Sequence, residues 1–161
     1  GGRGEVGMGH VEECWGCAPV FWFGECTLGE IHRSMGDIEK AVEGNEKMSA
    51  DLPMTNWALG PTYGMAGRLD DARKIAELMA ANPTPRDELY IALTYSAMGE
   101  IDEALRWLEL AYEDKADWLP WIGLKNAYGG AVEPMQDDPR FKAIVEKLNL
   151  LPSKGTIITA N

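Results

Sequence analysis

Cysteine and histidine residues near the start of the chain have a spacing that could support redox or metal chemistry. Cys14 and Cys17 form a C-x-x-C pair, and His10 precedes Cys14 by about one helical turn. Such a pair can exchange a disulfide, and thiolates with an imidazole bind zinc, for which Cys26 would be a further ligand. Redox use needs a strand before the pair and a helix after it, and the sequence predicts neither. We therefore favour small packing residues of a helix, and expect no cofactor and no metal.

Other side chains that could do acid–base chemistry lie where structural roles explain them. The pairs Asp70-Asp71 and Asp137-Asp138 stand at the starts of apolar-periodic segments, where carboxylates stabilise the positive end of a helix. The glycines at the start of the chain lack the Lys-Ser/Thr ending of a phosphate-binding loop. We predict that the protein is not an enzyme and that it has no catalytic residues.

The elements that would position these residues follow a pattern that occurs three times, in residues 28–41, 59–72 and 91–104. Each copy has a large apolar residue, a small residue, a histidine or tyrosine, a glycine and an alanine at fixed offsets. The small residue lets two helices approach, and the glycine ends the first helix in a left-handed conformation. The alanine seats the second helix. Because His32 takes the place of Tyr63 and Tyr95, we expect it to pack rather than to act as a base.

This pattern resembles the tetratricopeptide repeat (TPR), a helix-turn-helix unit with L-G-x-x-Y, then G, then A, and a period near ~34 residues. The resemblance implies an all-α fold, a right-handed α-solenoid of about three units in a single domain over residues 1–152. We assign the units to residues 20–53, 54–85 and 86–117, after a degenerate half repeat at 4–19 and before a C-terminal cap at 118–152. Residues 153–161 are expected to form a flexible tail.

Helices are predicted at residues 20–35, 38–50, 54–66, 69–81, 86–98 and 101–114. Pro61 lies inside the third of these, so we expect a kink there and a freed carbonyl at Trp57. In the cap we expect a helix over 118–126 and a last helix over 139–148, which Asp138 caps and Pro139 begins.

The cap resembles the C-terminal closure of repeat segments in bacterial multidomain regulators, including certain adenylate cyclases and winged-helix transcription regulators. At the other end, the half repeat and the missing initiator methionine suggest a chain that starts inside a longer array. A solenoid that starts within a unit leaves its first apolar face half covered. We therefore expect self-association, as a homo-oligomer, through residues 5–17.

Composition and charge restrict the classes of partner. The chain has 161 residues with 15 basic and 26 acidic side chains, and its net charge of −11 disfavours nucleic acid and anionic membranes. No apolar run approaches the ~20 residues of a membrane span, and the chain does not begin with a signal-peptide pattern. Three cysteines are an odd number for a disulfide framework. We expect a cytoplasmic protein with neutral or basic protein partners.

By the resemblance, inward positions of the first helices line a concave groove. These positions are Phe23, Cys26, Thr27, Glu30 and Arg33, then Met54, Trp57, Ala58, Pro61 and Met65, then Arg86, Leu89, Tyr90, Leu93 and Ala97. The lining is largely apolar, so the resemblance implies a non-catalytic scaffold that binds a peptide or partner segment. We expect Trp57 to be the anchor, because it is the tryptophan of the groove and lies in the middle unit. A plainer interpretation places Trp57 and Leu89 in the core. Another alternative is a sensory module that binds a small apolar ligand near Trp57, Trp118 and Trp121.

Overall fold

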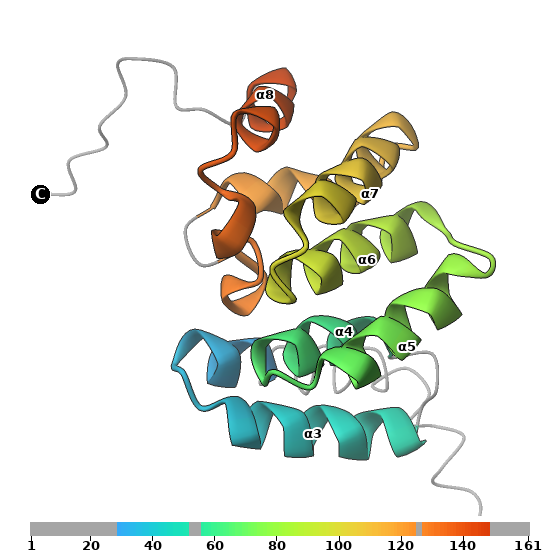
Figure 1. Cartoon of the computed structure of the whole chain (residues 1–161), viewed down its shortest axis with the longest axis vertical. Coiled ribbons are helices and arrows are strands. Elements are labelled where there is room, and N and C mark those ends of the chain that lie inside the picture. Colours follow the sequence, from blue (N-terminus) through green and yellow to red (C-terminus); the bar gives the residue numbers. More distant parts are fainter. Residues whose placement is uncertain (1–28, 52–55, 125–126, 149–161) are drawn as a thin grey trace, which may run out of the picture.

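The computed structural model describes residues 29–51, 56–124 and 127–148, and every regular element in these ranges is a helix (Figure 1). The chain is therefore all-α, as predicted. The predicted half repeat, the tail, and the segment with His10, Cys14 and Cys17 lie outside the described residues.

Six α-helices follow a short helical segment at residues 29–34. They are α3 (Ile38–Asp51), α4 (Asn56–Met65), α5 (Leu69–Ala80), α6 (Pro85–Ala97), α7 (Ile101–Glu113) and α8 (Pro139–Lys147). Their bounds agree with the predicted ones to within a single residue wherever the neighbouring residues are described. The hydrophobic periodicity thus located these six α-helices correctly.

A glycine in a left-handed conformation separates the helices of each predicted unit. Gly36, Gly67 and Gly99 have φ angles of 78°, 73° and 81°, which residues with a Cβ rarely adopt. Each lies between a first and a second helix, and the chain reverses its direction there, as α4 with α5 and α6 with α7 show in Figure 1. The predicted role of these glycines is confirmed.

Successive helix pairs stack through their first helices. α4 packs against α3, α5 and α6, and α6 also contacts α5 and α7. At Gly60 in α4, an added Cβ would lie 2.3 Å from Thr94 Oγ1 in α6, so only glycine permits this approach. The alanines of the pattern, Ala41, Ala72 and Ala104, are fully buried and seat the second helices.

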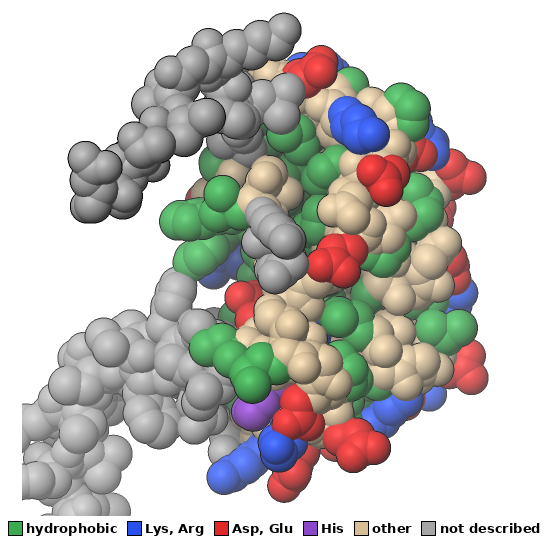
Figure 2. All heavy atoms as spheres, turned by 90° about the vertical axis from the view of Figure 1, so that its left-hand side faces the viewer, with side chains coloured by type: hydrophobic (Ala, Val, Ile, Leu, Met, Phe, Trp, Pro, Cys, Tyr) green, Lys and Arg blue, Asp and Glu red, His purple; other side chains and the backbone are tan. Residues whose placement is uncertain are grey.

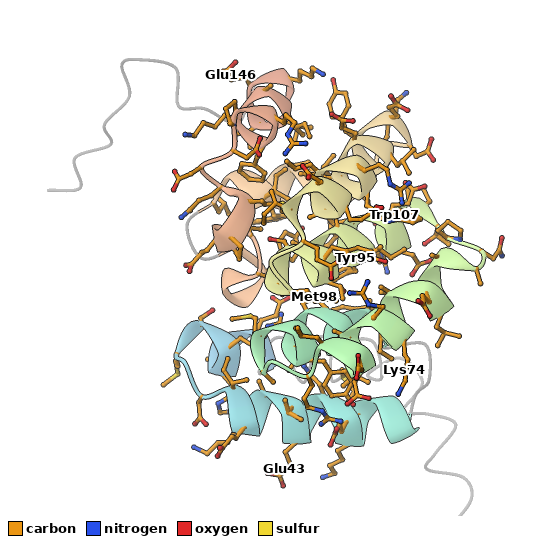
Figure 3. All side chains as sticks on the ribbon, viewed as in Figure 1. Glu43, Lys74, Tyr95, Met98, Trp107 and Glu146 are labelled. Atoms are coloured by element: carbon orange, nitrogen blue, oxygen red, sulfur yellow. The ribbon has the colours of Figure 1, made fainter. Side chains whose placement is uncertain are left out.

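The largest hydrophobic cluster joins α6 and α7 to the cap. Its fully buried members include Leu89, Leu105, Leu108, Ile122 and Met135. At the edge of this cluster Tyr95 and Trp107 are half-buried, whereas the charged side chains labelled in Figure 3 are exposed. On the side of the molecule shown in Figure 2, carboxylates are spread among hydrophobic side chains. The cap is therefore continuous with the core of the helix pairs.

The cap consists of three 3₁₀ helices before α8, and they are η3 (Leu119–Gly123), η4 (Ala127–Gly130) and η5 (Glu133–Met135). The predicted helix over 118–126 is wrong in type and length, because η3 ends at Gly123 and Leu124 is already extended. The predicted capping of α8 is confirmed, since the Asp138 side chain accepts a hydrogen bond from the Arg140 backbone N–H.

Thr84 and Asp87 form a reciprocal capping box at the start of α6. α4 continues through Pro61 to Met65.

In the part of the chain that the structure describes, no helix has the length and apolar character needed to cross a membrane.

Candidate functional site

A buried arginine organises the surface formed by the first helices. We call this surface, which comprises Glu30, Arg33, Trp57, Met65 and Tyr90, the first-helix face. Arg33 is only 3% exposed, and burial lowers the pKa of its guanidinium while Glu30 raises it. A buried guanidinium is costly unless acceptors surround it. The partners of Arg33 therefore decide how this face is built.

Those partners come from two distant parts of the chain. Arg33 Nη1 donates to Thr62 Oγ1 at 2.6 Å and to the Ala58 carbonyl at 3.2 Å, both in α4. Arg33 Nη2 donates to the carbonyl of Tyr128 at 3.3 Å, in η4 of the cap. One side chain thus joins the first described segment, the second helix pair and the cap.

Thr62 is the centre of a second set of buried hydrogen bonds. Its hydroxyl accepts from Arg33 and from Asn45 Nδ2, the latter at 2.8 Å, and it donates to the Ala58 carbonyl at 2.7 Å. The hydroxyl therefore uses its single donor and both lone pairs. Asn45 fits there because an added Cβ at Gly29 would lie 2.4 Å from Asn45 Oδ1.

Glu30 supplies the charge opposite Arg33. Its Oε1 lies 3.7 Å from Arg33 Nη2, and the carboxylate is partly exposed. Burial raises the pKa of Glu30, and the neighbouring guanidinium lowers it. Arg33 Nε has no hydrogen-bond partner among the described residues. The first-helix face therefore carries a compensated pair of charges rather than a free cation.

A row of aromatic rings crosses the face from α4 to the cap. The ring centroids of Trp57 and Tyr90 are 4.7 Å apart, and Tyr90 meets Tyr128 edge-on at 5.8 Å. The Tyr128 hydroxyl donates to the Trp118 carbonyl. Burial raises the pKa of both tyrosines, so both stay neutral.

The η4 segment lies directly on the first-helix face. Tyr128, Gly129 and Gly130 have positive φ angles of 53°, 62° and 88°, so the backbone makes a tight left-handed turn. A Cβ at Gly129 would lie 2.8 Å from both Arg33 Nε and the Glu30 carbonyl oxygen. Glycine is therefore required where the turn meets residues 29–34 (Figure 1).

The structure distributes the predicted groove residues over three environments. Arg33, Ala58, Pro61, Leu89, Tyr90 and Leu93 are buried. Glu30, Trp57, Met65 and Ala97 are half-buried, and Arg86 is exposed and pairs with Asp117 at 2.9 Å. Phe23, Cys26, Thr27 and Met54 lie outside the described residues. Leu89 and Leu93 are core residues in this structure, because neighbouring helices surround α6. Arg33 donates its hydrogen bonds to other residues of the same chain.

Sequence reasoning missed Asn45, Thr62 and the η4 turn as parts of this face. Asn45 carried a weak signal, since it is a polar residue in a helix where the pattern leads one to expect burial. The pair Gly129-Gly130 carried a signal as well, because consecutive glycines allow close approach of the backbone. The hydrogen bond between Arg33 and the Tyr128 carbonyl spans 95 positions, and no local sequence pattern reports such a contact.

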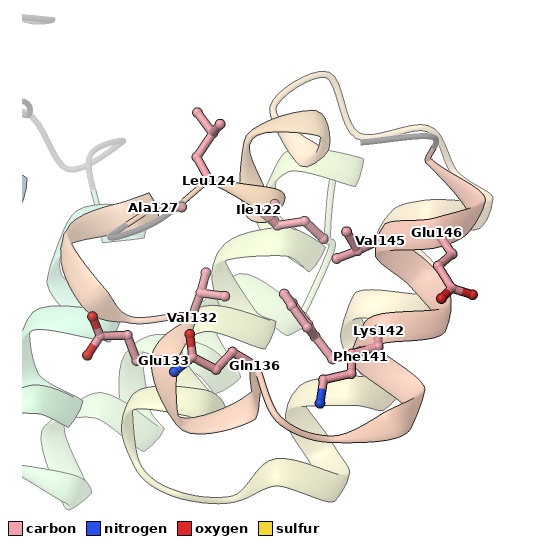
Figure 4. Close-up of a pocket in the computed structure, with 11 residues that line it drawn as sticks. Ile122, Leu124, Ala127, Val132, Glu133, Gln136, Phe141, Lys142, Val145 and Glu146 are labelled. Carbon is pink, nitrogen blue, oxygen red and sulfur yellow. The ribbon is translucent and has the colours of Figure 1, made fainter. Parts of the chain in front are cut away.

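A pocket of about 460 Å³ opens in the cap between η3, η5 and α8. Its apolar wall includes Ile122, Val132, Phe141 and Val145, and Lys142 and Glu146 of α8 also line it (Figure 4). Neither Trp57, Trp118 nor Trp121 lines this pocket. The predicted ligand pocket near the tryptophans is therefore not the one described here.

Within the described ranges, no group of three or more His, Cys, Asp or Glu side chains could hold a metal ion. Comparison with known proteins adds no relative, because no family model, no curated protein and no solved structure matches this chain.

Proposed function

We propose that the chain is a right-handed solenoid of TPR-type units and that it serves as a non-catalytic protein interaction scaffold. The glycine turns and the buried alanines recur at equivalent positions, which supports a repeated unit. Each unit buries its apolar side against the next, and this arrangement leaves one row of first helices to contact a partner.

The observation that carries this proposal is the η4 segment on the first-helix face. The face holds a stretch of irregular polypeptide by a guanidinium on its backbone carbonyl and by a ring on its side chain. Half-buried Trp57 and Met65 add apolar area beside it. A partner segment needs the same features, namely a donor for a carbonyl and an aromatic wall.

The charge of the chain supports a neutral or basic polypeptide as the partner. The net charge is −11, and Glu30 keeps a partly exposed carboxylate on the first-helix face. Long-range attraction would speed the approach of a basic segment and oppose nucleic acid or anionic lipid. We place this activity in the cytoplasm. Self-association through residues 5–17 remains a prediction.

A displayed library of random peptides, selected on the immobilised full chain, tests this function. Selected peptides should share an aromatic residue, and two-dimensional NMR should show the largest shift changes at Trp57, Met65 and Tyr90. If the selected peptides instead shift signals on the exposed face of α5, around Leu78, the first-helix face is not the binding site.

A second candidate function is the recognition of a small apolar ligand in the cap pocket. Its volume of about 460 Å³ lies within the range of small-molecule sites, and most of its wall is apolar. Saturable NMR shift changes at Ile122 and Val132 on titration with a medium-chain alcohol, abolished by Val145→Trp, would favour this candidate. Unchanged shifts at Ile122 and Val132 on addition of that alcohol would exclude it.

A further inference from the structure

The first-helix face and η4 together suggest how access to the proposed site is controlled. Among the described residues, η4 contacts this face through a hydrogen bond from Arg33 to the Tyr128 carbonyl, a ring contact between the buried Tyr128 and Tyr90, and the packing of Gly129 against Arg33. In addition, Tyr128 adopts a left-handed φ of 53° although it has a Cβ, which disfavours the seated form relative to an open one. Departure of η4 would expose the ring of Tyr128, so we expect η4 to leave when an aromatic residue of a partner takes that place.

Arg33 would keep most of its hydrogen-bond partners if η4 left the face. It would keep Thr62 Oγ1, the Ala58 carbonyl and the Glu30 carboxylate as partners. Only Nη2 would lose a hydrogen bond, and a carbonyl of another polypeptide could replace the one from Tyr128. The first-helix face therefore has the groups it needs to bind a segment of a partner in place of η4.

We propose that η4 is an internal occupant of the partner site, and that a partner enters by displacing it with an aromatic residue followed by glycine. This inference rests on the proposed function and names the recognition chemistry of the same face. The aromatic residue takes the place of Tyr128 against Tyr90. Glycine must follow, because a Cβ at position 129 would lie 2.8 Å from Arg33 Nε and from the Glu30 carbonyl oxygen.

The residue after that glycine is less restricted. A Cβ at Gly130 would meet its nearest neighbour, Met65 Cε, only at 3.6 Å, which is ordinary contact. Because η4 belongs to the same chain, it competes at a high effective concentration. The apparent affinity of a partner is therefore its intrinsic affinity multiplied by the fraction of molecules in which η4 has left the face.

The two glycines offer a matched pair of variants. Gly129→Ala and Gly130→Ala each add a methyl group at a left-handed residue, so both carry backbone strain, but only the first also collides with Arg33. The probe is a labelled, end-blocked peptide with the sequence of residues 127–133. We expect Gly129→Ala to bind it at least ~10-fold more tightly than the wild type, and Gly130→Ala to bind it less than ~3-fold more tightly. A peptide with alanine at its first glycine should bind neither variant.

Hydrogen exchange of the wild-type chain provides the second measurement. Amides of residues 129–132 should exchange by local opening, faster than those of Leu93 and Leu105 in the core. If Gly129→Ala is folded with rapidly exchanging η4 amides but does not bind the peptide, the proposal is overturned. If Gly129→Ala does not fold, hydrogen exchange of the wild type becomes the test. The proposal is also overturned if the η4 amides of the wild type exchange only through global unfolding.

The same data separate this inference from the proposed function. A library-selected peptide that binds the first-helix face while the η4 amides keep their protection would leave the scaffold function standing and overturn the displacement. If no selected peptide binds the first-helix face, the proposed function itself is overturned.

Discussion

Arg33 and Tyr128 are joined by a hydrogen bond of 3.3 Å from the buried guanidinium to a backbone carbonyl 95 positions further along the chain. This contact ties the start of the described helices to the cap. It also means that the proposed partner surface and the end of the helical array cannot be altered independently.

Replacement of Arg33 by methionine should destabilise the fold. The change leaves Thr62 and the Ala58 and Tyr128 carbonyls with fewer donors and leaves Glu30 without its opposite charge. Breaking such a pair costs about 3 kcal/mol in the free energy of unfolding, measurable by urea denaturation. Arg106→Met is the control, because its ion pair with Glu103 is exposed and should contribute under about 0.5 kcal/mol. Equal losses for both variants would contradict the buried cluster.

Two glycine-to-alanine changes in helices should have opposite signs. Gly60→Ala drives a methyl group to 2.3 Å from Thr94 Oγ1 and should cost about 1–3 kcal/mol through overpacking. Gly44→Ala in α3 meets nothing within 4 Å and should stabilise by about 0.5–1 kcal/mol through helix propensity. Thermal unfolding monitored by circular dichroism measures the change in stability of both variants. A stabilised Gly60→Ala would show that α4 and α6 are not as close as described.

Much of the fold could be predicted from the sequence because its determinants are local. Gly67, for example, ends one helix in a left-handed conformation, and glycines with the same conformation recur at Gly36 and Gly99. The η4 turn could not be predicted, since its position depends on Arg33, which is remote in sequence. The resemblance to the tetratricopeptide repeat placed Leu89 in a groove, but neighbouring helices on several sides of α6 bury it, as the plainer interpretation expected.

The buried Glu88 predicts a pH dependence of stability. Burial raises its pKa above the ordinary 4.5, and the nearby Asp114 raises it further. The folded state therefore binds the proton more tightly than the unfolded state, so the ionised carboxylate destabilises the fold above its folded pKa. This penalty should disappear as the pH falls from the folded pKa towards 4.5.

Glu88→Gln should accordingly be more stable than the wild type at pH 7, and the difference should shrink as the pH approaches 4.5. Urea denaturation at several pH values measures it, with Glu43→Gln on the exposed side of α3 as the control. A difference that grows on acidification would contradict the assignment.

The thiols should be dispensable for folding. If Cys14, Cys17 and Cys26 fill small helical sites, replacing all three by alanine should leave helicity and Tm within a few degrees, since alanine is the better helix former. Loss of bound zinc together with unfolding would instead restore the metal interpretation. Circular dichroism with metal analysis of the purified chain distinguishes the two.

The most direct test of the scaffold function is a calorimetric titration of a selected peptide into the wild type and into Trp57→Ala, with Leu78→Ala as the surface control. Trp57 is half-buried against Tyr90, so its loss should weaken binding by ~2 kcal/mol, about 30-fold in Kd, while most of the helicity remains. Leu78→Ala should bind like the wild type. A folded Trp57→Ala that binds the peptide with unchanged Kd would contradict the proposed site, and an unfolded one would place Trp57 in the core.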